Sequence, residues 1–496
     1  MARLKEYNGH YCESEYEYAF IGFLEAEGWK YSSGNNIHRV TKRDVLIADD
    51  FKKFIADTNP DLTEDEVTQI YDNVRLVGAE SNFATLHKVY GWMVNGVQFT
   101  SQDGLPRMIS LIDFDNWDKN IFRVVNQFTV EYTNNGQKEN RRPDVLLFVN
   151  GMPLCVVELK NPVDANATIY DAWEQINIRY WRDIPHLLHY CPLACISDGV
   201  KTRLGTVRTP YEHFYAWRRV NEGDVVSTLP FAETETMIKG VYTPERFVEI
   251  FRDYIYFQDS IYDSDEVEIV CRYPQFFAAK LLKQSIVNSV VTRSGKGGTY
   301  FGATGCGKTY TMAFLARQLA LRCTDIPEIG SPTIILIVDR DELQKQGSKL
   351  FTKSKEFLNL GEVSVVKNRT QLRQELGARQ SGGFYICTIQ KFCDREDDKI
   401  GLINDRQNII CFSDEAHRTQ LEHSKKIQFS KDADENMKAM VSKPYAKVLK
   451  EAFPHATFVG FTGTPIAETY QTFGDEIDRY TMDQAVADGL TVSIKY

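Results

Sequence analysis

Several features that define other protein classes are missing from this 496-residue sequence. It has no run of 18 or more apolar residues, which excludes a transmembrane helix of ordinary length. Its first residues, MARLKEYN, lack the apolar segment of a secretory signal. The ten cysteines are scattered and form no C-x-x-C pair, so no zinc site is indicated. We therefore expect a cytoplasmic protein with reduced, buried thiols and no membrane contact.

The sequence also lacks an excess of basic residues and any internal repeat. Its 58 Lys and Arg residues stand against 68 Asp and Glu residues, which gives a formal net charge of −10. Nucleic-acid binding domains are more often basic, but an acidic total does not exclude binding, because a local basic surface is enough. With 43% hydrophobic and 25% charged residues, the chain is globular, and its length suggests two to four domains.

One stretch organises the second half of the sequence. GATGCGKT at residues 302–309 fits the phosphate-binding loop G-x-x-x-x-G-K-[ST], and it lies between a predicted strand at 298–301 and a predicted amphipathic helix at 310–321. The glycines let backbone N–H groups point at phosphate oxygens, and the helix N-terminus favours negative charge. Lys308 would reach the β- and γ-phosphates of ATP, and the Thr309 hydroxyl would bind Mg²⁺. The predicted nucleotide-binding residues of this loop are Gly302, Thr304, Gly305, Cys306, Gly307, Lys308 and Thr309.

Around this loop, apolar strands alternate with helices from about residue 267, a pattern typical of a parallel α/β sheet. The strand at 408–413 leads directly into Asp414 and Glu415, at the strand end where such sheets place their ligands. Asp414 would bind the same Mg²⁺, and Glu415 would polarise the attacking water. His417 and Thr462 would sense that site, and the Gln275 amide would bind the adenine edge.

The first half of the sequence contains a predicted hairpin at 142–160. Strands are predicted before it at 110–114 and 126–132, followed by a turn at 134–137. Within the hairpin, Asn150-Gly151 joins two apolar runs, as in a tight β-turn. The register of its two strands is not fixed to one residue by this pattern.

Three charged residues interrupt this otherwise apolar hairpin. Asp144 would lie roughly opposite Glu158 and Lys160, which share a face because they are two residues apart on a strand. Two carboxylates can hold Mg²⁺, which activates water at a scissile phosphate, while the lysine stabilises developing charge. This is the pattern P-D-x(n)-[DE]-x-K of a large nuclease superfamily. The alternative is an ordinary hairpin with a polar face.

Two further residues are candidates for the same site. Gln175 lies on a predicted helix after the hairpin, and Glu17 lies on the first predicted helix, at 13–27. Either side chain could also be an ordinary solvated helix residue.

Together these motifs resemble a known family. Their order is similar to that of superfamily 2 helicases and translocases. The residues within each motif resemble those of the R (restriction, motor) subunit of type I restriction–modification enzymes. The matching stretches are RPD at 142–144, ELK at 158–160, CRYPQ at 271–275, VDR at 338–340, TIQKF at 388–392, DEAHRTQ at 414–420 and GFTGTP at 460–465.

The resemblance implies an α/β chain with two domains. Residues 1–260 would form a PD-(D/E)xK-type endonuclease domain with a mixed sheet and flanking helices. Residues 261–496 would form the first RecA-like helicase lobe, which binds ATP. In the family a second lobe follows, so its absence before Tyr496 suggests a piece of a longer chain or a truncated product.

The resemblance also implies a function. The family pumps unmodified double-stranded DNA at the expense of ATP and cuts it with Mg²⁺, in a complex with modification (methyltransferase) and specificity subunits. The nuclease roles would fall to Asp144, Glu158 and Lys160, and the ATPase roles to Lys308, Thr309, Asp414 and Glu415. The family often shows Q-x-x-x-Y after the nuclease lysine. Here Arg179 stands at that spacing from Gln175 and Tyr180 follows one later, which leaves the tyrosine open.

Two other functions fit the same residues. The chain could be a DNA-stimulated helicase or translocase whose N-terminal domain is structural and does not cut. It could also be a nucleotide-binding interaction module without turnover.

Overall fold

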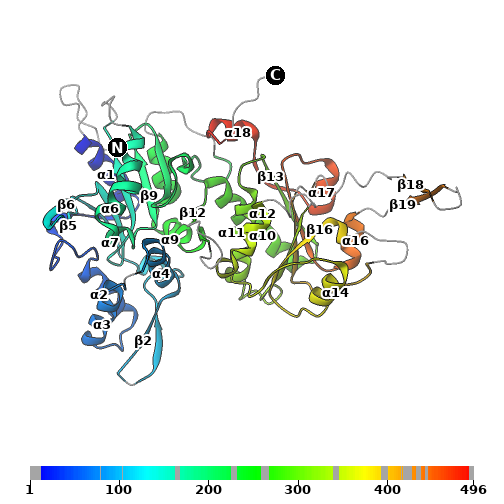
Figure 1. Ribbon diagram of the computed structural model, residues 1–496, viewed down its shortest axis with the longest axis horizontal. Helices are drawn as coiled ribbons and strands as arrows, with labels where there is room; N and C mark the ends of the chain where they lie inside the picture. The colour runs from blue at the N-terminus through cyan, green and yellow to red at the C-terminus, as the bar shows by residue number, and fades with distance from the viewer. Residues whose placement is uncertain are drawn as a thin grey trace. The chain divides into compact units, whose positions relative to one another are not determined.

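The computed structural model describes residues 13–78, 80–102, 104–161, 168–224, 232–258, 267–338, 346–392, 400–414, 416, 427–431, 437–441 and 445–490. These residues separate into two compact units. The first unit runs to Phe257 and includes the strand at 268–270, and the second unit begins at Cys271 (Figure 1). Within the described parts of the chain, no helix combines the length and apolar composition needed to cross a membrane.

The first unit has both helices and strands. Its helices are α1 (Glu13–Ala26), α2 (Ala48–Thr58), α3 (Glu64–Arg75), α4 (Asn82–Asn95), α5 (Ile169–Glu174), α6 (Trp181–Asp183), α7 (Pro185–Leu188), α8 (Ala232–Val241) and α9 (Pro244–Asp253), with a π-helix at Gln175–Tyr180. Its strands are β1 (Lys30–Ser33), β2 (Val97–Thr100), β3 (Pro106–Ile109), β4 (Phe122–Asn126), β5 (Val130–Asn134), β6 (Gln137–Arg141), β7 (Val145–Val149), β8 (Met152–Leu159), β9 (Leu193–Ser197), β10 (Thr202–Thr206), β11 (Ile255–Phe257) and β12 (Glu268–Val270).

A mixed six-stranded sheet, in the order β1-β4-β7-β8-β9-β10, forms the centre of this unit. Every residue of β7 and β8 is buried, which explains why the two strands read as nearly continuous apolar runs. They form the predicted hairpin, in which Asn150 and Gly151 take positive φ angles of 50° and 76°. Such angles suit the tight turn that joins antiparallel strands.

Two strand predictions before the hairpin were wrong. Residues 110–114 lie outside any strand, because the strand in this region, β3, ends at Ile109. The predicted strand at 126–132 is divided between β4 and β5, and Gln127 between them has a positive φ of 56°. That angle turns the chain out of the sheet, so β5 pairs with β6 in a separate two-stranded ribbon.

The second unit alternates strands and helices as predicted. Its helices are α10 (Tyr273–Thr292), α11 (Lys308–Arg322), α12 (Gln346–Thr352), α13 (Lys355–Leu358), α14 (Arg369–Gly377), α16 (Tyr445–Ala452), α17 (Ala467–Phe473) and α18 (Met482–Ala487). Its strands are β13 (Lys296–Gly302), β14 (Thr333–Val338), β15 (Val363–Val365), β16 (Phe384–Thr388), β17 (Ile409–Ser413), β18 (Ile427–Lys431), β19 (Met437–Val441), β20 (Thr457–Thr462) and β21 (Glu476–Tyr480).

Seven of these strands form one sheet in the order β15-β16-β14-β17-β20-β13-β21. Each neighbouring pair is parallel, so all seven carboxyl ends lie at one edge. Helices lie on both sides of this sheet (Figure 1). Loops that follow β13, β17 and β20 therefore meet, because these three strands are neighbours.

Candidate functional site

The hairpin brings Asp144 and Glu158 together at one edge of the six-stranded sheet. The last pair in its ladder is Val145 with Val157, so the next residues outward, Asp144 and Glu158, face each other. The Asp144 carboxylate accepts a hydrogen bond from the Leu159 N–H at 2.8 Å. The register that the sequence left open is thus the one that places the two acids opposite each other.

Glu158 is buried, and only one of its two carboxylate oxygens is hydrogen-bonded within the described residues. Its side chain is 0% exposed, and its Oε1 accepts a hydrogen bond from the Tyr180 hydroxyl at 2.6 Å. Its Oε2 has no hydrogen-bond partner among the described residues, and the Lys160 ammonium stands 4.0 Å away. Burial raises the pKa of Glu158 well above its usual range, the Asp144 charge adds to the rise, and Lys160 opposes it.

A chain of hydrogen bonds closes around this carboxylate. Lys160 Nζ donates to Gln175 Oε1 at 3.0 Å, and Gln175 Nε2 donates to the Tyr180 hydroxyl at 2.9 Å. Burial and the neighbouring Glu158 carboxylate raise the pKa of Tyr180, so its hydroxyl keeps the proton that it donates to Glu158. The predicted residues Lys160 and Gln175 therefore lie in one network with Glu158.

Glu17 lies at the same edge of the sheet but is not bonded to that network. Its carboxylate accepts hydrogen bonds from Asn126 at 2.5 Å and Gln127 at 3.4 Å. Asn126 is the partner of Val145 in the β4–β7 ladder, next to Asp144. No local pattern predicted this hydrogen bond, because it depends on the bend that ends β4.

The phosphate-binding loop follows β13 in the second unit. Gly305 and Gly307 have φ angles of 84° and 87°, and α11 begins at Lys308. Lys308 is 9% exposed, and its Nζ donates to the Gly302 carbonyl at 3.2 Å within the loop. Thr304 and Gly305 are exposed and Thr309 is half-buried, whereas Cys306 is buried. The glycines thus serve the left-handed turns that the motif requires.

Two of the other predicted nucleotide residues lie at the same edge of the sheet as this loop. Thr462 ends β20 beside Phe301 of β13, and Asp414 follows β17, which is the next strand. A Cβ built on Gly463 would lie 3.3 Å from Thr304 Oγ1, so the loop after β20 touches the phosphate-binding loop. Glu415 and His417 lie outside the described residues.

The Gln275 amide is bonded within the protein. Its Nε2 donates to the Gly307 carbonyl at 3.3 Å, and its Oε1 accepts from the Arg272 N–H at 2.9 Å. The contact supports the phosphate-binding loop from α10. Recognition of adenine by Gln275 stays a prediction.

Comparison with known proteins gives matches over nearly the whole chain. Residues 11–213 match the model of the type I restriction enzyme R protein N terminus, and residues 274–496 match that of the SWI2/SNF2 ATPase. The chain is 30% identical over 98% of its length to the HindI type I restriction enzyme endonuclease subunit of Haemophilus influenzae. The chain is therefore similar to endonuclease subunits of type I restriction enzymes over nearly its whole length.

Other matches are to proteins of the same description or are more distant. A protein assigned as the MjaIXP type I restriction enzyme endonuclease subunit of Methanocaldococcus jannaschii is 29% identical over 97% of the chain. The chain spans 46% and 45% of the lengths of the HindI and MjaIXP subunits. A solved fragment assigned as an HsdR subunit from Vibrio vulnificus is 16% identical with a TM-score of 0.28, over 75% of this chain and 57% of that one. No common fold is established at that score.

The tyrosine that sequence spacing left open is placed by the π-helix. Residues five apart on an α-helix point about 140° away from each other, since each residue turns by about 100°. The π-helix at Gln175–Tyr180 bonds residues five apart instead, and it brings the Tyr180 hydroxyl onto Gln175. The π-helix thus accommodates the one extra residue that separates Gln175 from Tyr180 relative to Q-x-x-x-Y. No signal in the sequence pointed to this distortion.

We predict that Tyr180→Phe weakens the site without unfolding the protein. The change removes the one hydrogen-bond donor to Glu158 among the described residues, and loss of such supporting bonds costs ~10–100-fold in metal affinity or activity. Titrating DNA cleavage with Mg²⁺ should show a higher half-saturating concentration. Tyr170→Phe is the matched control, because Tyr170 is 46% exposed on the preceding helix. Equal titrations for the two variants would contradict the prediction.

Proposed function

We propose that this chain is the nuclease and motor subunit of a type I restriction enzyme. In this proposal the first unit is a PD-(D/E)xK-type domain that hydrolyses phosphodiester bonds of unmodified double-stranded DNA. The second unit is the first RecA-like lobe of a motor that hydrolyses ATP and moves the DNA. The observation that carries the proposal is the network joining Asp144, Glu158, Lys160 and Gln175. The names of the curated relatives, which are endonuclease subunits of type I restriction enzymes, support the same function.

The residues at the hairpin edge fit a divalent cation. Two carboxylates face each other there, one fully buried, and Glu158 Oε2 has no hydrogen-bond partner among the described residues. A buried carboxylate with one oxygen outside any hydrogen bond is costly, and a cation between the two acids would reduce that cost. No group of three or more His, Cys, Asp or Glu side chains in the described ranges could hold a metal. Asp144 and Glu158 would therefore hold Mg²⁺ together with oxygens from backbone, water or DNA.

When bound, Mg²⁺ would activate water and neutralise charge on the scissile phosphate. The chain's own residues have separate tasks. Tyr180 fixes the Glu158 carboxylate by donating to Oε1. The other oxygen, Oε2, has no hydrogen-bond partner among the described residues. Gln175 holds the Lys160 ammonium, which is 14% exposed and carries positive charge to the mouth of the site. Lys160 would stabilise the charge that develops on the phosphate during attack.

In the second unit, the phosphate-binding loop supports ATP binding. Lys308 would leave the Gly302 carbonyl for the β- and γ-phosphates, and Thr309 and Asp414 would hold Mg²⁺. In this proposal Glu415 polarises the attacking water, and His417 and Thr462 sense the nucleotide site. As partners we propose double-stranded DNA and the modification and specificity subunits of the complex, in line with the relatives' description as subunits.

We expect Mg²⁺ to stabilise the protein through the acid pair when ATP is absent. A ligand at ten times its Kd stabilises a protein by ~1.4 kcal/mol, which corresponds to a rise of ~2–6 °C in Tm for a domain of this size. Differential scanning fluorimetry with MgCl₂, and with NaCl at equal ionic strength, measures the effect. Asp144→Asn should lose most of the rise. An equal rise in the variant would place the ion elsewhere.

The proposed function is tested by incubating the purified chain with plasmid DNA, Mg²⁺ and ATP. We expect nicked or linear DNA with Mg²⁺ and intact DNA with EDTA. If ATP is consumed and no DNA is cut under any metal condition, the chain is a motor with a structural N-terminal domain.

A further inference from the structure

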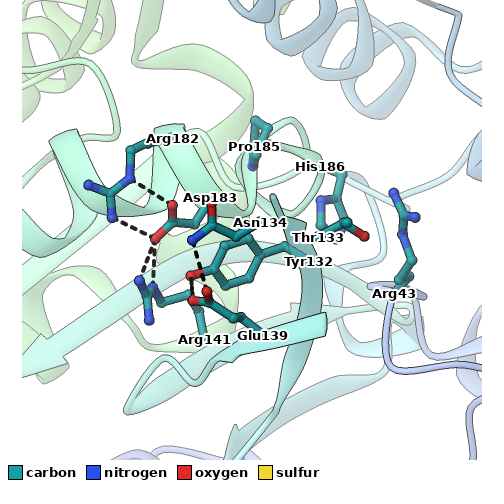
Figure 2. Close-up of a pocket in the computed structure, with 10 residues that line it drawn as sticks. All are labelled: Arg43, Tyr132, Thr133, Asn134, Glu139, Arg141, Arg182, Asp183, Pro185 and His186. Carbon is teal, nitrogen blue, oxygen red and sulfur yellow. Dashed lines mark hydrogen bonds and ion pairs between the residues drawn. The ribbon is translucent and has the colours of Figure 1, made fainter. Parts of the chain in front are cut away.

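A polar pocket whose lining does not include the acid pair lies in the first unit. It has a volume of about 670 Å³ and is lined by β5, β6, α6, α7 and the loop before α2 (Figure 2). That volume lies within the usual range of ligand pockets, ~300–1,000 Å³. Three arginines line it against two acids, which leaves an excess of positive charge in a chain whose net charge is −10.

Two of these arginines converge on one carboxylate, as Figure 2 shows. Arg141 Nε and Arg182 Nε each donate to Asp183 at 2.7 Å. The hydrogen bond from Arg182 lowers the pKa of Asp183, and Arg141 lowers it further, so this acid stays charged. One negative charge is thus shared by two guanidinium groups, each of which has five N–H donors.

The second acid of the pocket is bound by neutral donors. Glu139 accepts hydrogen bonds from the Tyr132 hydroxyl at 2.5 Å and from Asn134 Nδ2 at 2.8 Å. Both oxygens of this carboxylate are therefore occupied. In the described part of the chain it forms no ion pair with the pocket's arginines, so Asp183 is the one acid that the arginines of the pocket share.

The third arginine stands at the pocket without a carboxylate partner. Arg43 is exposed, and among the described residues nothing accepts a hydrogen bond from its guanidinium. The buried Nε2 of His186, also in the lining, has no hydrogen-bond partner in the described ranges either. An exposed guanidinium without an acceptor, in a pocket with an excess of positive charge, favours an anion with several oxygens, such as a phosphate group.

The loop that carries Arg43 is fixed to the ribbon that forms the pocket. The Glu131 N–H of β5 donates to the Lys42 carbonyl at 3.0 Å, and Asp44 Oδ2 accepts from the Thr41 N–H at 2.8 Å. Arg43 lies between these two anchors. Its position at the pocket is therefore held by the backbone and does not depend on the side chain itself.

The pocket is close to the acid pair along two chain segments. Arg141 precedes Asp144 by three residues, and Asp183 follows Tyr180 by three residues. Three residues span at most ~11 Å even when fully extended. DNA carries a phosphate on each strand every ~3.4 Å of helix axis, so one strand could reach both the pocket and the acid pair within a few nucleotides.

We propose that this pocket binds a backbone phosphate of the DNA strand, within a few nucleotides of the bond that the acid pair cuts. The proposal rests on the proposed nuclease function for the position of the cut. Arg43, with the outward N–H groups of Arg141 and Arg182, is the binding group. The contact positions the strand and carries no sequence preference.

The test compares DNA binding by the full chain and by Arg43→Ala across a salt series. A 30-base-pair duplex, EDTA in place of Mg²⁺ and fluorescence anisotropy give the affinity without cutting. We expect several-fold weaker binding for Arg43→Ala, with any sequence, and a slope of log affinity against log salt that is smaller by about one. Arg43→Lys should recover most of the affinity. The control is Lys239→Ala, which removes an exposed cation from α8 of the same unit and should keep the wild-type slope.

Duplexes in which half of the phosphate linkages are neutral methylphosphonates test whether Arg43 contacts the DNA backbone. These duplexes should bind the wild type more weakly than unmodified DNA, and the loss should be smaller for Arg43→Ala. An Arg43→Ala variant that binds like Lys239→Ala, or an equal loss in the wild type and Arg43→Ala, would overturn the proposal.

The same preparations separate this proposal from the nuclease function. If Asp144→Ala abolishes cutting and Arg43→Ala binds DNA like the wild type, the nuclease stands and the pocket does not. If Arg43→Ala lowers the salt slope and no cutting depends on Asp144, the pocket stands as a backbone contact and the nuclease assignment fails.

Discussion

Replacing Asp144 with alanine is expected to abolish DNA cleavage by this chain while ATP hydrolysis continues. Asp144 faces the buried Glu158, and the two carboxylates are the acids that would hold Mg²⁺. Without Asp144 the ion loses half of its protein carboxylates, and we expect a loss of about a thousandfold or more in the cleavage rate. The second unit has its own phosphate-binding loop, so its chemistry does not depend on this residue.

The measurement is plasmid nicking with Mg²⁺, run beside phosphate release from ATP on the same preparations. Asp118→Ala is the matched control, because Asp118 is an exposed aspartate of the same unit. Lys160→Ala should also lose cleavage, since it removes the cation 4.0 Å from Glu158. Cleavage by Asp144→Ala at the rate of Asp118→Ala would show that the hairpin is structural.

Replacing Lys308 with alanine is expected to reduce ATP hydrolysis by about a hundredfold or more, because it removes the cation that meets the β- and γ-phosphates. In the structure this ammonium is held in the loop by the Gly302 carbonyl, where a nucleotide phosphate could draw it away. Fluorescent ATP binding and phosphate release measure the two steps. Metal-dependent nicking that needs no translocation should persist.

A matched lysine lies on the same strand for comparison. Lys296 is exposed at the start of β13, the end opposite to the phosphate-binding loop. Lys296→Ala should keep ATP hydrolysis at the wild-type rate. If both variants hydrolyse ATP equally, the loop does not act as an ATPase site.

Much of the fold followed from local patterns. The hairpin at β7–β8 was predicted from two apolar runs around Asn150-Gly151, and the turn that these residues form sets the pairing of the strands. The strand–loop–helix around residues 302–309 was predicted for a similar reason, because every residue of the motif is contiguous in the chain. The prediction failed at 126–132, where a single positive φ at Gln127 ends one strand and starts another.

The sequence by itself thus determined the elements whose geometry depends on neighbouring residues, including the phosphate-binding loop and the hairpin that carries Asp144 and Glu158. Only the tertiary structure decided the contacts between distant segments. Glu17 accepts a hydrogen bond from Asn126, and the π-helix brings the Tyr180 hydroxyl within hydrogen-bond distance of Glu158. The physical reason is that turn chemistry and periodicity act over a few residues. Which side chains meet across a sheet depends on register, bends and helix distortions that no local pattern encodes.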